Sequence, residues 1–178
     1  MYPKSSLSPG AHGTLKLMFG KRTQLLRSGA RAPEFQLARL GGGAVKLADA
    51  IANGPAVLAF FKISCPVCQL TLPFLDRIAA AGTIAVYGIS QNSERDTRRF
   101  VEEYSLAFPM LLDSEDAGYP ASNAYGIAHV PTIFLVERDG ALGRVVEGWS
   151  EGDVAWLGTR AGVNPLRPTD NVPELKAG

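Results

Sequence analysis

The chain has 178 residues, 46% of them hydrophobic, and a formal net charge of +1, which together suit one folded domain. The nearly balanced charge gives neither a nucleic-acid footprint nor a basic membrane patch, so we expect no nucleic-acid partner. No apolar stretch reaches the ~20 residues that span a bilayer, and residues 15–22 are too interrupted by basic side chains for a signal-peptide core. The sequence therefore predicts a cytoplasmic protein, or a periplasmic one if a native leader was trimmed.

The sequence pattern predicts an arm (residues 1–28), a domain (29–162) and a tail (163–178). The arm is rich in Ser, Gly and basic residues, and the tail carries three prolines in a polar stretch, so we expect an irregular arm and a loose tail. The apolar run 56–61 follows a turn-forming Asn-Gly-Pro and indicates a fully buried strand. The elements predicted after it are a helix beginning near residue 65, a strand over 83–90, a helix from 92 or 93 to 104, a strand over 110–113, a brief helix over 116–126, a hairpin of strands 132–138 and 142–149, and a helix over 153–161. Strands separated by helices, followed by a hairpin, predict an α/β fold with a mixed sheet covered on both faces.

Cys65 and Cys68 are the only cysteines, and they lie three positions apart. A structural zinc site usually needs four ligands, but the chain has no second cysteine pair, and His12 and His129 are far apart in sequence. A purely structural disulfide fits badly because the entropy that it removes grows with loop size, and this loop is minimal. The spacing therefore favours thiol–disulfide exchange, and we expect no metal.

The pair lies where the buried strand meets the following helix. If Ser64 or Cys65 caps that helix, the Cys65 sulfur faces unpaired backbone N–H groups and the positive end of the helix dipole, which favour a thiolate. Pro66 fits the first helical turn. Cys68, one turn further in, is expected to be more buried, and Pro73 is expected to kink the helix.

This order of strand, Cys-x-x-Cys and Pro73-bearing helix, followed by His129-Val130-Pro131-Thr132 before a strand, resembles the thioredoxin superfamily. The segments 29–35 and 125–136 are most similar to those of the TlpA/ResA-like thiol–disulfide oxidoreductases, which are redoxins related to the AhpC/TSA proteins. The resemblance covers residues 29–162. It implies a thioredoxin-like mixed sheet flanked by helices on both faces.

The resemblance also implies a site and a reaction. Cys65 would attack a disulfide and Cys68 would resolve the mixed disulfide, so the redox-active pair would be the only cofactor. Pro131 would be a cis-proline facing the pair, and the backbone of Val130 would pair with a bound peptide. The other expected substrate-binding residues are Ser64, Pro66, Val67 and Thr132, with Lys62 and His129 as candidate modulators. The expected partners are a protein disulfide or dithiol and an upstream thiol donor, with the protein acting as a reductase.

The chain departs from the family pattern at three positions. Ser64 stands where a Trp commonly precedes the first cysteine, Thr71 where an acidic residue often follows the second, and Ala59 where thioredoxin keeps a buried Asp. No obvious carboxylate is therefore positioned to take the proton from Cys68. We expect resolution to depend on water or the helix dipole.

Two alternatives share the fold. A peroxiredoxin-like thiol peroxidase typically carries P-x-x-x-[ST]-x-x-C, and neither cysteine here has proline and hydroxyl at those offsets. A Sco-like copper chaperone would use Cys65, Cys68 and His129, because two thiolates and an imidazole suit copper. Sco proteins, however, have a Cys-x-x-x-Cys spacing.

Overall fold

The computed structural model describes residues 24–178, and residues 1–23 of the expected arm lie outside this range. It contains a seven-stranded sheet of order β2-β1-β5-β4-β3-β6-β7 and a two-stranded sheet of β8 and β9. The strands are β1 (Gln36–Arg39), β2 (Ala44–Lys46), β3 (Ala56–Phe61), β4 (Ala85–Ser90), β5 (Met110–Leu112), β6 (Thr132–Val136), β7 (Leu142–Glu147), β8 (Trp149–Ser150) and β9 (Leu175–Lys176). The helices are α1 (Leu47–Ala50), α2 (Pro66–Ala79), α3 (Glu94–Glu103), the 3-10 turn η1 (Glu115–Ala117), α4 (Pro120–Tyr125) and α5 (Glu151–Ala161).

The central strand β3 is buried along its whole length, as its continuous apolar sequence predicts. It runs parallel to β4 and antiparallel to β6. Because side chains alternate along a strand, Val57, Ala59 and Phe61 enter one core cluster, while Leu58 and Phe60 enter the other.

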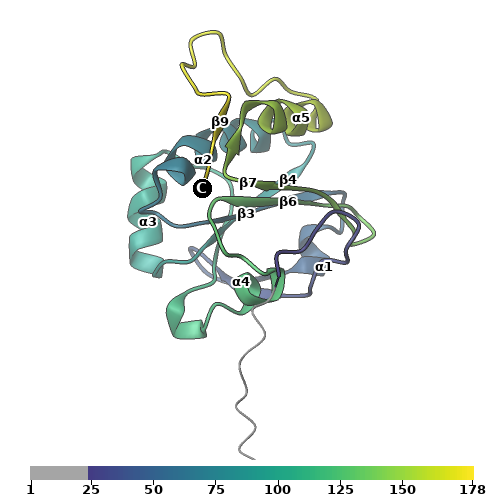
Figure 1. The fold of residues 1–178 in the computed structure, drawn as a ribbon. Helices are drawn as coiled ribbons and strands as arrows, with labels where there is room; N and C mark the ends of the chain where they lie inside the picture. Colours follow the sequence, from purple (N-terminus) through teal and green to yellow (C-terminus); the bar gives the residue numbers. More distant parts are fainter. Residues whose placement is uncertain (1–23) are drawn as a thin grey trace, which may run out of the picture.

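Helices cover both faces of the sheet (Figure 1). The first cluster takes its helical side chains from α2, α3 and α5, and the second from α1 and α4. The mixed sheet flanked on both faces is therefore confirmed. The carboxyl ends of the parallel strands β3 and β4 meet at one edge, where α2 and α3 begin.

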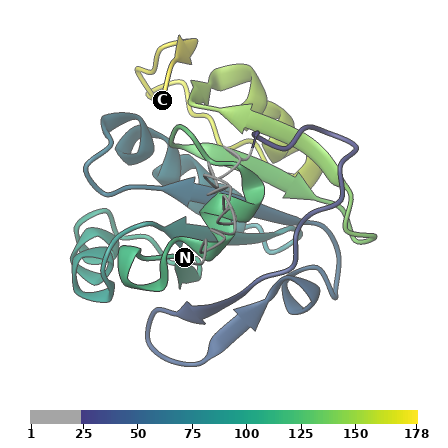
Figure 2. The same ribbon diagram turned by 60° about the horizontal axis from the view of Figure 1, so that its bottom comes forward.

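A hairpin of β1 and β2 precedes β3, and the sequence pattern predicted no strand there. It joins the sheet through β5 and forms one edge, opposite β7 (Figure 2). Only Leu37 of its seven residues is buried, so the strands lack the apolar alternation that would have marked them. The tight connection uses Gly41, Gly42 and Gly43, all with positive φ.

The brief helix expected over 116–126 is two pieces, because Gly118 adopts a left-handed conformation (φ +74°) between η1 and α4. The α4 start is fixed by the buried carboxylate of Asp113, which accepts hydrogen bonds from the backbone N–H groups of Ala121 (2.9 Å) and Ser122 (2.7 Å). This helix leads directly into the loop at residues 128–131.

The tail expected to be loose is packed against the domain, so that expectation is wrong. Arg77 of α2 makes a bidentate ion pair with Asp170, at 2.5 and 3.1 Å. The indole N–H of Trp149 donates to the carbonyl of Pro173 at 2.6 Å, and β9 pairs with β8. These contacts are long-range, so the polar, proline-containing sequence of the tail does not reveal them.

The described end of the arm also belongs to the fold. Leu25 and Leu26 pack against the second core cluster, and the N–H of Leu26 donates to the carbonyl of Tyr125 at 3.3 Å. The division of the chain at residues 28 and 162 stays a prediction.

Candidate active site

The site begins in the loop between β3 and α2. Cys65 is the N-cap of α2, with extended backbone (φ −87°, ψ 114°), and its Sγ accepts the N–H of Cys68 at 3.2 Å. Pro66 occupies the first turn, where its missing N–H costs nothing, and α2 continues through Pro73 to Ala79. The expectation that Ser64 or Cys65 caps the helix is confirmed for Cys65. The kink at Pro73 stays a prediction.

Two amides that sequence reasoning missed hold this loop from opposite sides. The Asn92 side-chain oxygen accepts the N–H of Ile63 at 3.0 Å, and the Gln69 side-chain nitrogen donates to the carbonyl of Ile63 at 2.9 Å. Asn92 follows β4, whose carboxyl end lies beside that of β3, so its place after a parallel strand was the available signal. Asn92 does not cap the following helix: the cap of α3 is Ser93, whose hydroxyl accepts the N–H of Asp96.

The two cysteines are thiols in different environments. Cys65 is partly exposed, whereas Cys68 is fully buried in the first core cluster. Burial raises the pKa of the Cys68 thiol, and its hydrogen bond with the Cys65 side chain raises it further. At neutral pH Cys68 is therefore a protonated thiol, and it becomes nucleophilic only when a base takes its proton.

The loop before β6 closes the other side of the site. The Val130–Pro131 peptide bond is cis, as expected for Pro131, and the Cys65 thiol donates to the carbonyl of Val130 at 3.3 Å. The loop is braced by Thr132, whose hydroxyl donates to the His129 carbonyl at 2.7 Å, and by Gly148, whose N–H donates to the Pro131 carbonyl at 2.8 Å.

The other expected substrate-binding residues surround Cys65 unevenly. Ser64 and Pro66 are exposed beside it, while Val67 is buried in a third cluster with Phe74 and Trp149. Thr132 is buried, so its contribution is to the loop conformation. The structure thus brings the Cys-x-x-Cys segment and the 129–132 loop together through the contact of Cys65 with Val130.

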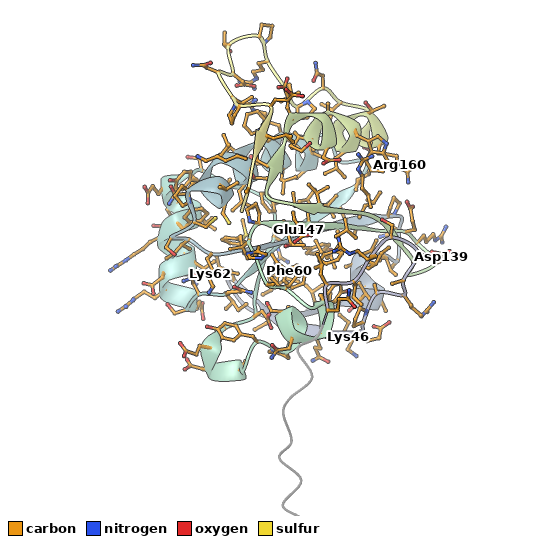
Figure 3. The ribbon with its side chains drawn as sticks, in the orientation of Figure 1. Lys46, Phe60, Lys62, Asp139, Glu147 and Arg160 are labelled. Atoms are coloured by element: carbon orange, nitrogen blue, oxygen red, sulfur yellow. The ribbon has the colours of Figure 1, made fainter. Side chains whose placement is uncertain are left out.

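Of the two candidate modulators, Lys62 lies at the end of β3 and His129 has an exposed side chain. Lys62 lines a hollow of about 220 Å³ together with Gln91, Tyr119, Val130 and others. In Figure 3 Lys62 and Glu147 lie toward one end of the sheet, and Asp139, at the β6–β7 turn, lies at the other. The larger hollow, of about 490 Å³, lies where β3 and β4 begin, away from the cysteines.

Ala59 and Thr71 stand at two positions where the family pattern places an acidic residue. Ala59 is buried within β3, and the Thr71 hydroxyl donates to the Val67 carbonyl at 2.7 Å within α2. Burial and the Cys65 side chain raise the pKa of Cys68, and a hydrogen bond from the backbone of Lys62 lowers it. No acidic side chain contributes to the shift. Over residues 24–178, no three His, Cys, Asp or Glu side chains gather closely enough to hold a metal ion.

Comparisons with known proteins agree with this geometry. A model of the AhpC/TSA family matches residues 28–145. Thiol-disulfide oxidoreductase ResA from Geobacillus thermodenitrificans is 27% identical over 124 residues, which cover 67% of this chain and 69% of that protein.

Solved structures with the same fold include the thioredoxin domain of a thiol-disulfide oxidoreductase from Bacteroides vulgatus. It has a TM-score of 0.67 at 24% identity and covers 78% of this chain and 99% of that one. A secreted disulfide oxidoreductase from Mycobacterium tuberculosis, homologous to E. coli DsbE, has a TM-score of 0.60 at 25% identity and covers 69% of this chain and 92% of that one. The thioredoxin-like fold and the ResA-like resemblance are therefore confirmed.

The same comparisons bear on the open alternatives and on location. They favour thiol–disulfide exchange over the peroxidase and the copper chaperone. The expected cytoplasmic location is not supported, since one solved relative is described as secreted. Within the described range, none of the helices has the length and apolar character needed to cross a membrane.

Proposed function

The chain belongs to the AhpC/TSA family and is a thiol–disulfide oxidoreductase, and we propose that Cys65 is its attacking thiol and Cys68 its resolving thiol. One observation carries this assignment: Cys65 is partly exposed at the start of α2, while Cys68 is buried one turn further along. A partner disulfide can reach the first sulfur and cannot reach the second. We propose that these two sulfurs are the redox group of the protein and that it uses no further cofactor.

In the first step the Cys65 thiolate attacks one sulfur of the partner disulfide. The Cys65–partner S–S bond forms, the partner's own S–S bond breaks, and the leaving sulfur takes up a proton. The N–H of Cys68, directed at the Cys65 sulfur, is the backbone donor nearest to the charge that reacts.

In the second step Cys68 loses its proton and attacks the Cys65 sulfur. The Cys65–Cys68 bond forms, the mixed disulfide breaks, and the partner leaves with two thiols, having gained two electrons and two protons. The raised pKa of Cys68 makes its deprotonation the demanding part of this step. Because no carboxylate contributes to that shift, we propose that water or the departing partner thiolate takes the proton.

The partner's polypeptide would lie against Ser64, Pro66 and the 130–132 loop. The 3.3 Å contact between the Cys65 thiol and the Val130 carbonyl supports this placement, because a backbone bound at Val130 would hold its sulfur beside Cys65. The exposed Lys62 and His129 flank this surface and would tune partner choice rather than the chemistry.

We propose the reductase direction, with electrons supplied by an upstream thiol donor. This direction follows the resemblance to thiol-disulfide oxidoreductase ResA, and the potential of the Cys65–Cys68 disulfide decides it. Equilibration of the Cys65–Cys68 disulfide with a glutathione buffer should give a potential closer to thioredoxin's, about −270 mV, than to DsbA's, about −120 mV. A value near DsbA's would reverse the proposed direction.

The thiol roles are tested with Cys65→Ser and Cys68→Ser in an insulin-reduction assay. Both variants should lose turnover, but only Cys68→Ser should accumulate a mixed disulfide with the protein substrate, visible on a non-reducing gel. Accumulation with Cys65→Ser instead would exchange the two roles. Turnover retained by Cys65→Ser would refute the mechanism.

We propose an extracytoplasmic location in place of the cytoplasmic one, supported by the secreted relative from Mycobacterium tuberculosis. Fractionation of the producing cells, followed by immunodetection with cytoplasmic and exported marker proteins, tests this. Recovery with the cytoplasmic marker alone would contradict it.

A further inference from the structure

Residues 170–178 run from beyond α5 to the cis-proline loop that contacts Cys65. We call residues 170–178 the strap. Its strand β9 pairs antiparallel with β8, Trp149 opposite Lys176 and Ser150 opposite Leu175, and the N–H of Glu151 donates to the Glu174 carbonyl at 2.9 Å. Figure 1 shows this yellow segment returning from the loop beyond α5 toward the middle of the molecule.

The tip of the strap meets the cis-proline loop. A β-carbon placed on Gly178 would come 2.6 Å from the Val130 carbonyl oxygen, and one placed on Gly148 would come 2.5 Å from the Lys176 carbonyl oxygen. Both glycines are therefore packed backbone to backbone against their neighbours. The Val130 carbonyl is also the acceptor for the Cys65 thiol, so Gly178 and Cys65 meet at one backbone group.

We propose that the strap occupies the position of a partner's polypeptide, and that a protein disulfide binds as an extended strand that displaces residues 174–178. This inference rests on the proposed function, because it assumes exchange at Cys65. Strand addition beside β8 and Val130 gives the partner main-chain hydrogen bonds in place of those that the strap makes. The partner is therefore an unfolded or flexible disulfide-bearing segment, while a small disulfide needs no strand position.

The two ends of the strap are held differently. Residues 170–173 form the root of the strap. The root is fixed by the Arg77–Asp170 ion pair, by the hydrogen bond from the Trp149 indole to the Pro173 carbonyl, and by the packing of Val172 on the third core cluster. The Arg77 guanidinium also holds the pKa of the Asp170 carboxyl below its usual range.

Beyond the root, residues 174–178 are all exposed, and Leu175 is 70% exposed. A two-residue strand with this exposure opens at low free energy, so the tip can leave while the root stays.

Lys176→Pro in the full chain tests the displacement, because proline removes a backbone donor from β9 without altering any residue that contacts Cys65. Lys176→Ala is the matched control, since it removes the same side chain and keeps the donor. We expect Lys176→Pro to raise kcat/KM for insulin at least about threefold over Lys176→Ala. This corresponds to a rise in the fraction of molecules with a displaced strap from about one third to nearly all. Oxidised glutathione should be reduced equally by both variants.

The outcomes separate this inference from the proposed function. Equal insulin rates in the two variants, with both substrates reduced, would overturn the strap proposal and leave the exchange mechanism standing. Failure of the unmodified protein to reduce either substrate would refute the exchange function itself. A rise for both substrates would show that the strap restricts Cys65 generally, which would also overturn the proposed strand displacement.

Hydrogen exchange measured by mass spectrometry gives a second test that leaves the strap sequence intact. In Cys68→Ala, Cys65 is first activated as a mixed disulfide with thionitrobenzoate, and a thiol of the unfolded insulin B chain or of glutathione then displaces thionitrobenzoate to give the adduct. The amides of residues 175–178 should lose protection at least about tenfold in the B-chain adduct only, because an opening that frees the strand exposes its donors. Equal protection in the two adducts would overturn the proposal.

Discussion

The backbone N–H of Cys68 points at the sulfur of Cys65, 3.2 Å away, so the resolving residue solvates the attacking one before any partner arrives. This follows from the place of Cys65 as N-cap of α2, where a side chain accepts from the third residue of the helix. The same geometry turns the Cys68 side chain into the core. One local motif thus produces both the exposed and the buried thiol.

This difference predicts selective alkylation. At pH 7, iodoacetamide should modify Cys65 in the reduced protein and leave Cys68 unmodified, because Cys68 is fully buried with a raised pKa. Peptide mass spectrometry after brief labelling measures the two sites. In guanidinium chloride both cysteines should react, which serves as the control. Comparable labelling of Cys68 in the folded protein would contradict the assignment.

The buried thiol also predicts how stability responds to alkaline pH. The unfolded chain releases the Cys68 proton near its ordinary pKa of 9.0, while the folded protein retains it to higher pH. The free energy of unfolding of the reduced protein should therefore be unaffected by this group below pH 9 and fall above it, by up to about 1.4 kcal/mol per pH unit. Urea unfolding between pH 8 and 10 measures this, with Cys68→Ser expected to show a shallower decline. Identical slopes would show that Cys68 titrates alike in both states.

The absence of a carboxylate relay predicts that two nearby polar residues are dispensable for turnover. Thr71→Ala removes a hydroxyl that donates only to the Val67 carbonyl, so it should cost about 1 kcal/mol of stability and leave insulin reduction close to normal. Lys62→Ala should likewise retain turnover. Single-turnover measurement of mixed-disulfide resolution is the direct readout. Abolished resolution in either variant would reveal a proton acceptor that the geometry does not show.

Asp113 is predicted to be a structural residue on which the loop at 128–131 depends. Asp113→Ala leaves two buried N–H groups of α4 without an acceptor and should cost about 3 kcal/mol. Asp113→Asn keeps one acceptor oxygen and should lose less. Chemical denaturation measures both against Asp116→Ala, an exposed acid with an expected change near zero. An Asp113→Ala variant as stable as that control would refute the role.

The centre of the fold could be predicted because its signals are local. The apolar run of β3, the position of Cys65 before Pro66, and the Val130-Pro131 dipeptide before an apolar strand each carry their own physical explanation. These residues specify the core strand, the helix start and the loop that meets it. The thioredoxin-like arrangement follows from their order.

The features that sequence reasoning missed depend on pairing at a distance. The β1–β2 hairpin is short and almost fully exposed, so its sequence lacks alternation. Asn92 accepts a hydrogen bond from Ile63, and Trp149 donates one to Pro173. The partners in each pair are too far apart in sequence for a local motif to predict the contact. The strap has the composition of a disordered tail, and its ion pair, its indole hydrogen bond, the packing of Val172 and its two-residue strand order it.

Trp149 gives the protein an intrinsic optical signal. Its ring lies 4.8 Å from that of Phe74 on α2, and its indole N–H is bonded to Pro173 at the root of the strap. Trp156, the other tryptophan, lies instead under the guanidinium of Arg144 at 4.5 Å. Trp149 also stands opposite Lys176 in the β8–β9 pair, so displacement of residues 174–178 should change its emission, and the spectrum of the unlabelled protein can follow the strap in real time.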